Sequence, residues 1–97
     1  SDIQVQCQGA VNRILPDDLI GSKHQRFILQ ISLFQTVLIA HNIDIANRVE
    51  DVQLNTTVEF YGEYEWNSEG GVIHWTHHDP NGQHVDGWLK YAGKIYQ

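Results

Sequence analysis

Apolar and polar positions alternate along much of the chain, which is the pattern of strands buried on one face. The clearest alternation places Val58 and Phe60 on one side of a strand, with Glu59 and Glu63 on the other. Alternation also marks the start of the chain, and shorter apolar runs follow it. We therefore predict five β-strands, which span residues 4–15, 27–33, 36–40, 58–66 and 72–78.

Breaks in this pattern indicate how the strands are connected. Gly9 interrupts the first alternation, which predicts a bulge or a sharp bend. Before the fourth strand, Ile45 and Val49 lie four residues apart, and Asn42 or Asp44 could cap a helix start, so we predict one or two helical turns. Three strands, a short helix and two strands is the order of the oligonucleotide/oligosaccharide-binding (OB) barrel. A five-stranded barrel of the SH3 type, which lacks this helix, is the alternative.

The length of 97 residues fits a single domain over residues 1–97. We expect an OB-like barrel over about 4–78, followed by a turn-rich extension over 79–97. Apolar residues around Ala92 and Gly93 predict a last small hairpin folded onto the barrel. No apolar run approaches the roughly 18 residues that a membrane-spanning helix needs, so we expect no membrane span.

The charge balance narrows the classes of partner. The chain has 12 Asp and Glu residues against 6 Lys and Arg residues, and the basic residues are scattered. Proteins that bind nucleic acids usually present a basic stripe to the phosphates, so nucleic acid is a disfavoured partner. An unknown small ligand, cationic or neutral, or a protein suits the charge better. Glu59, Glu63 and Glu65 form an acidic strip that fits a cation, a basic peptide or solvent.

Cys7 is the only cysteine, which excludes an internal disulfide. Its place in the first strand predicts a small buried side chain. Phe60, Tyr64 and Trp66 share the apolar face of the fourth strand and are expected in the core. The sequence contains no nucleophile elbow and no glycine loop that would cradle a phosphate.

Four of the six histidines fall within eleven residues, and two aspartates lie among them. Imidazole and carboxylate are ligands of zinc, and carboxylate suits manganese. A strand rises about 3.3 Å per residue, so His74 and His78 would lie about 13 Å apart and could not bind one ion. A site forms only if the strand ends near His77 and the next turn folds back. The predicted ligands of a divalent metal, zinc or manganese, are then His78, Asp79, His84 and Asp86.

The same residues have two other interpretations. The segment 79–82 reads Asp-Pro-Asn-Gly, which is a turn sequence, and the flanking His and Asp side chains could hold the loop through hydrogen bonds. The second interpretation is that these residues bind a ligand or act in catalysis without a metal.

Two further places carry candidate binding residues. Arg26, near the loop between the first two strands, could pair with Asp17 or Asp18, or lie in a solvated loop. The second place is His41, at the end of the predicted third strand, where a histidine is most often structural. In OB barrels the first loop often borders the ligand. We predict one binding site, which joins these places to the fifth strand and consists of His24, Arg26, His41, Asn42, His74 and His77.

Long motifs in this chain resemble a bacterial family of unknown function, DUF3465. They lie at 15–18, 24–27, 38–44, 58–66, 71–80 and 84–89, and cover nearly the whole chain. The resemblance implies a small exported protein whose leader has been removed, so a periplasmic location is expected. It would also explain why the chain contains no methionine. It implies no activity.

The function expected from the sequence is an OB-like binding module with an unknown ligand. A small metal-dependent hydrolase, such as a nuclease, is the alternative from another class. A structural or protein-interaction domain that uses the acidic strip is the third hypothesis.

Overall fold

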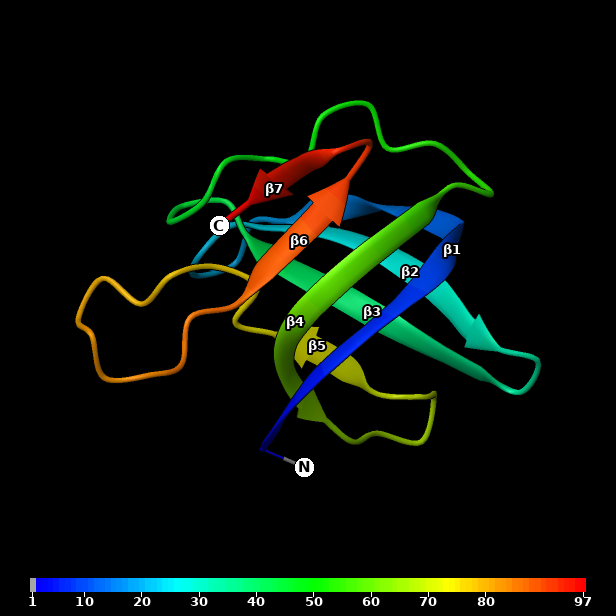
Figure 1. The fold of residues 1–97 in the computed structure, drawn as a ribbon, viewed down its shortest axis with the longest axis horizontal. Helices are drawn as coiled ribbons and strands as arrows, with labels where there is room; N and C mark the ends of the chain where they lie inside the picture. The colour runs from blue at the N-terminus through cyan, green and yellow to red at the C-terminus, as the bar shows by residue number, and fades with distance from the viewer. Residues whose placement is uncertain (1) are drawn as a thin grey trace.

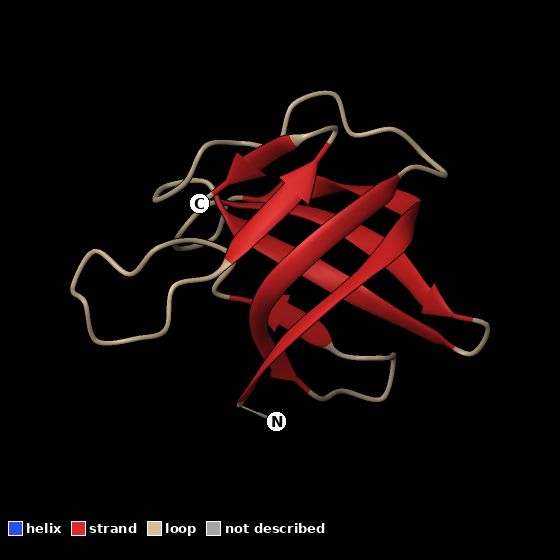
Figure 2. Cartoon of the chain, viewed as in Figure 1, coloured by secondary structure: helices blue, strands red, loops and turns tan. Residues whose placement is uncertain are grey.

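The computed structural model describes residues 2–97, and their regular structure is entirely β-sheet (Figure 1, Figure 2). The strands form one sheet in the order β1-β2-β3-β5-β4-β6-β7, and β1 also pairs with β4. This extra pairing closes β1, β2, β3, β5 and β4 into a ring. The prediction of an all-β fold is confirmed. The strands are β1 (Ile3–Asp18), β2 (His24–Ser32), β3 (Gln35–Asn42), β4 (Thr57–Glu65), β5 (Val72–His74), β6 (Trp88–Tyr91) and β7 (Lys94–Tyr96).

The long strand β1 pairs with two different neighbours along its length. Its first half pairs with β4 as far as Ala10, and its second half pairs with β2 from Ala10 onward. A Cβ at Gly9 would lie 2.6 Å from the carbonyl oxygen of Gln30, so only glycine permits this close approach. The strand continues through Gly9 and changes its pairing partner at Ala10. The first irregularity of its pairing with β2 comes between Val11 and Arg13, two residues beyond the bulge or bend predicted at Gly9.

The change of partner also explains why Cys7 is exposed, although the sequence predicted a buried side chain. Cys7 pairs with Phe60 of β4, but it precedes the part of β1 that pairs with β2. One side of the strand is therefore open at this position.

The apolar face of β4 fills the ring as predicted, with Val58 and Phe60 almost fully buried. The predicted hairpin around Ala92 is present as β6 and β7, and β6 pairs with β4 outside the ring. Its Leu89 and Tyr91 belong to the core. Trp66, expected in the core, is 67% exposed because β4 ends one residue before it.

The short helix predicted before β4 is wrong, because residues 43–56 form turns and no helix occurs among residues 2–97. The first turn does form, with the amide of Ala46 bonded to the Asn42 carbonyl. Asp51 and Asn55 then adopt positive φ angles, which a right-handed helix does not allow. The segment still buries Ala46 and Val49 against the ring.

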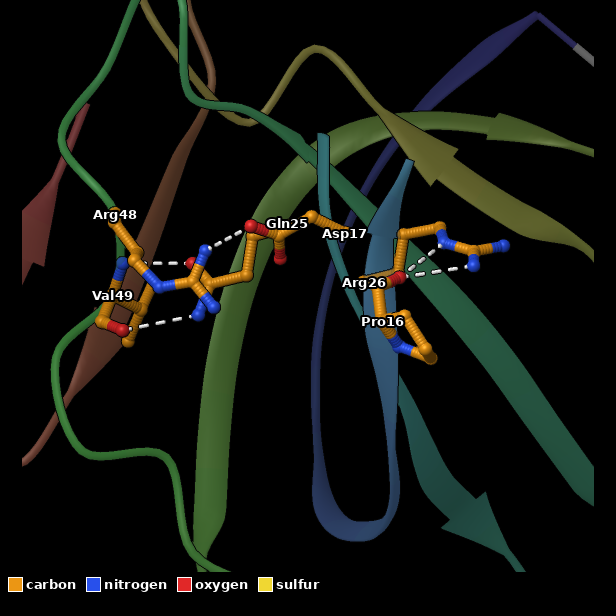
Figure 3. A network of polar contacts seen from close by, with 6 residues as sticks. All are labelled: Pro16, Asp17, Gln25, Arg26, Arg48 and Val49. Carbon is orange, nitrogen blue, oxygen red and sulfur yellow. Dashed lines mark hydrogen bonds and ion pairs between the residues drawn. The ribbon is translucent and has the colours of Figure 1, made fainter. Parts of the chain in front are cut away.

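Residues 43–56 do not continue as a helix after their first turn, and the side chain of a buried glutamine binds their backbone instead (Figure 3). The Gln25 side chain donates to the Val49 carbonyl at 3.0 Å and accepts from the Val49 amide at 2.8 Å. Both backbone groups of Val49 are therefore satisfied by one side chain of β2.

Of the alternatives left open for Arg26, the pair with Asp17 or Asp18 does not form. Arg26 donates twice to the carbonyl of Pro16, at 2.9 and 3.0 Å, whereas Asp17 pairs with Arg48 at 2.6 Å (Figure 3). Pro16 lies in the irregular stretch between Leu15 and Asp18, where the register of the β1–β2 pair shifts. Asp17 instead pairs with Arg48, which belongs to the segment 43–56.

We expect Gln25→Met to lower the free energy of unfolding by about 2 kcal/mol, because it leaves two buried backbone groups of Val49 without partners. Urea unfolding followed by tryptophan fluorescence measures the change. Gln8→Met, at an exposed position of β1, is the matched control and should change stability by less than about 0.5 kcal/mol. Equal stabilities of the two variants would contradict the role given to Gln25.

None of the described residues forms a helix with the length and apolar character needed to span a membrane.

Candidate functional site

One cleft of about 400 Å³ gathers most of the chemically versatile side chains. It lies where β2 begins and β3 and β5 end, with the outer face of β4 as one wall. A larger hollow of about 580 Å³ between the β2–β3 turn and residues 66–70 has only one charged side chain, Glu69. The smaller cleft is therefore the better candidate. Its lining residues are Ser22, His24, Asn42, Glu63, Glu65, His74, Trp75 and His77.

Four of the six predicted binding residues line this cleft, and two lie elsewhere. His24, Asn42, His74 and His77 are in the lining. Arg26 borders a separate hollow with Leu15 and Ile28. His41 is fully buried inside the ring. Whether the four gathered residues bind a ligand stays a prediction.

The backbone at Trp75 shapes the cleft. Trp75 has a φ of 57°, a left-handed conformation that is rare for a bulky residue. This turn ends β5 at His74, four residues before the end of the predicted strand. The indole then stacks on His84, with ring centroids 3.9 Å apart, and lies against His77 at 5.1 Å. A costly backbone conformation thus places an indole between two imidazoles, which is the kind of strain that collects at functional sites.

Two histidine–glutamate pairs lie along the wall formed by β4. Glu63 contacts His84 at 3.1 Å, and Glu65 contacts His74 at 3.1 Å. Partial burial lowers the pKa of His84, but the hydrogen bond and charge of Glu63 outweigh it, so the pKa is raised overall. His84 therefore holds a proton more readily than an ordinary histidine.

Two other imidazoles of the lining each hold Nδ1 against a backbone carbonyl. His77 Nδ1 is 2.6 Å from the carbonyl of His78, and His24 Nδ1 is 2.9 Å from the carbonyl of Ser22. A carbonyl only accepts, so each Nδ1 carries the hydrogen, and Nε2 of the neutral ring is an acceptor. Neither Nε2 has a partner among residues 2–97. Burial lowers the pKa of His77, although the His78 carbonyl offsets part of the effect, so this ring favours the neutral form.

The loop that follows the cleft is held by a carboxylate. Asp79 accepts backbone N–H groups from Asn81, Gln83 and His84. These bonds, led by that of Asn81, lower the pKa of Asp79. Asp86 accepts the amide of Asp79 itself at 2.9 Å. The interpretation of this segment as a hydrogen-bonded turn therefore matches the geometry.

The predicted metal ligands point in different directions. His78 Nδ1 contacts the carbonyl of Gln97 at 2.7 Å, while His84 turns to Glu63. Within residues 2–97, no three His, Cys, Asp or Glu side chains are placed to hold a metal ion. Metal binding by His78, Asp79, His84 and Asp86 stays a prediction.

His41 lies behind the cleft wall as a structural residue. Its Nδ1 accepts from the Thr76 hydroxyl at 2.7 Å, and its Nε2 donates to the Asn47 carbonyl at 2.9 Å. Burial lowers the pKa of His41 to about 4. The ring thus ties residues 43–56 to the segment after β5.

Sequence reasoning left Glu63, Glu65 and Trp75 out of the predicted site. The signal for the two glutamates was present in the acidic strip, which was interpreted separately from the histidines. The strand register brings the acidic strip beside the histidines, because Glu63 lies directly opposite His74 in the β4–β5 pair.

Comparison with curated proteins and with solved structures gives no match. A family model described as "Protein of unknown function (DUF3465)" matches residues 1–97, the whole chain. The chain therefore belongs to the DUF3465 family, as its motifs indicated.

Proposed function

We propose that the chain is an OB-like binding module whose cleft takes a small cation rich in N–H donors, such as a primary amine or a guanidinium. The observation that carries the proposal is the chemistry of the lining. Its titratable groups are two carboxylates, Glu63 and Glu65, and three imidazoles, and it contains no lysine or arginine. The Nε2 atoms of His24 and His77 add two acceptors when their rings are neutral.

The charge of the whole chain supports a cationic ligand. The formal net charge is -6, so a cation is attracted from a distance, and a cleft with walls of low dielectric concentrates that attraction. The same field opposes the phosphates of nucleic acids.

The OB-like part of the proposal rests on the connectivity. A three-stranded meander is followed by a covering segment and a closing hairpin, and the cleft includes Ser22 of the loop between β1 and β2. Turns at 43–56 replace the usual helix. That residues 1–97 form one domain, and that this domain is exported, are parts of the same proposal.

The test is calorimetric titration with spermidine and with arginine methyl ester. We expect Glu63→Gln and Glu65→Gln each to weaken binding about tenfold, because a charge-assisted hydrogen bond becomes a neutral one. Glu59→Gln is the matched control, since Glu59 is on the same outward face of β4 but outside the cleft. It should bind like the unchanged chain.

Two results would contradict the proposal. One is that neither cation binds to the unchanged chain at low salt, where charge attraction is strongest. The other is that all three glutamine variants lose affinity equally, which would indicate attraction by overall charge without a site.

Binding should weaken on acidification, by about tenfold between about pH 7.5 and pH 5.5. The raised pKa of His84 means that it charges early and draws Glu63 away from the ligand. Titrations at several pH values measure the change. Affinity that is constant or rises toward low pH would show that the imidazoles do not take part.

A further inference from the structure

A second hollow opens where β1 begins and β2 ends. Its volume is about 360 Å³. Phe60 and Ile73 of the core lie beneath its floor, with side chains that are almost fully covered. Val5, Cys7 and Ile31 border it from β1 and β2. We call this hollow the ring mouth.

The ring mouth follows from the pairing of β1. The first β1 residue paired with β2 is Ala10, opposite Gln30, so Ile31 has no partner on β1. Val5 and Cys7 pair only with β4, opposite Gly62 and Phe60. Residues 43–56 cover the other end of the ring, where Val49 joins the core. The mouth therefore remains open where β1 and β2 separate.

All ten residues around the ring mouth are uncharged, and most of the exposed lining is hydrocarbon. A charged group there would lose its hydration with no counter-charge to replace it. The volume falls within the range of roughly 300–1,000 Å³ that small-molecule sites occupy. Both charge and size therefore select a small, uncharged, apolar molecule.

We propose that the ring mouth is a binding site for a small uncharged apolar molecule, which enters between β1 and β2 and packs on Val5 and Ile31. Burial of its surface drives binding, because apolar surface on both partners leaves water. This site shares no lining residue with the cation cleft. The proposal is therefore independent of the proposed function.

The reactivity of the Cys7 thiol reports whether the ring mouth is occupied. It is the only cysteine of the chain, it is exposed, and it lines the ring mouth. A molecule in the mouth would shield this thiol from alkylation. No chemical role for the thiol is part of the proposal.

The first experiment titrates the chain with N-phenyl-1-naphthylamine, an uncharged fluorescent probe, and displaces it with 1-octanol. Cys7→Phe fills the mouth and should weaken probe binding by about tenfold or more. Ile95→Phe is the control, because it adds an aromatic ring at an exposed position on β7. Its affinity should equal that of the unchanged chain. Equal binding by both variants, or no binding to the unchanged chain, overturns the proposal.

The second experiment needs no variant. The rate at which iodoacetamide alkylates Cys7 is measured by mass spectrometry with and without saturating 1-octanol. We expect the rate to fall about tenfold when the mouth is occupied. An unchanged rate overturns the proposal. So does a rate that falls with protein concentration alone while a dimer appears in sedimentation, since a second copy would then be the occupant.

Discussion

Acidification from about pH 7 to pH 4 is expected to destabilise the folded chain by about 3 kcal/mol through His41 alone. His41 is completely buried, and both ring nitrogens are satisfied in the neutral form by Thr76 and Asn47. A proton on Nδ1 would place a charge in the core and remove the acceptor that Thr76 uses. Burial accordingly lowers the pKa of His41 from 6.5 to about 4.

The direction of the effect follows from proton binding. Below a pH of about 6.5 the unfolded chain takes up a proton at His41, while the folded chain stays neutral until about pH 4. The unfolded state therefore gains stability as the pH falls through this window, and the loss levels off below it. Each pH unit within the window costs about 1.4 kcal/mol.

Urea unfolding at several pH values separates His41 from the carboxylates, which also titrate. His41→Leu should be less stable at neutral pH, because it leaves the buried hydroxyl of Thr76 unpaired, but its stability should depend less on pH by about 3 kcal/mol. His78→Gln, at an exposed position, should retain the pH dependence of the unchanged chain. If His41→Leu retains it too, His41 is not the group responsible.

The substitution Gly87→Ala is expected to cost about 3 kcal/mol or more, because the new methyl group has no space. Its Cβ would lie 1.8 Å from the Trp75 carbonyl oxygen and 2.5 Å from that of Tyr61. Both obstacles are backbone, which cannot rotate away. The amide of Gly87 also donates to the His77 carbonyl at 2.9 Å, so the chain cannot move outward without breaking this bond.

Gly82→Ala is the matched control for this prediction. Gly82 lies in the same loop with a φ of 66°, and nothing lies near its added Cβ. Only the cost of the left-handed conformation, about 1 kcal/mol, is expected. Thermal unfolding compares the two variants, and near-ultraviolet circular dichroism reports whether the stacked Trp75 and His84 rings separate in Gly87→Ala. Similar losses of stability would contradict the steric argument.

The alternation of side chains was enough to predict the strands, because burial on one face imposes a period of two. It located the inward face of β4 at Val58 and Phe60. It could not reveal that one strand pairs with two neighbours, since pairing between distant segments leaves no local pattern. For that reason the exposure of Cys7 was not predicted. The helix prediction failed where tertiary bonds from Gln25 satisfy the backbone of Val49.

The candidate site was predicted in part for a similar reason. The histidines were recognisable as candidate site residues from their side-chain chemistry. The fold brings His24, His74 and His77 together in one cleft. The left-handed turn at Trp75 was not predictable, because its residue type does not favour it. That turn ends β5 early, and the Trp75 indole stacks on His84, which contacts Glu63. The metal prediction relied on a fold-back that occurs, but the carboxylates of Asp79 and Asp86 bind backbone amides there.

The double pairing of β1 has a further consequence for the order of folding. The β1–β2 and β2–β3 pairs join neighbouring segments, but closure of the ring requires residues 3–10 to meet residues 57–64, about half the chain away. The entropy of closing that loop must be overcome before the β1–β4 contacts stabilise the structure. Such non-local topology is characteristic of chains that fold in milliseconds to seconds. We therefore expect the pairing of β1 with β4, which closes the ring, to be the slow step of folding.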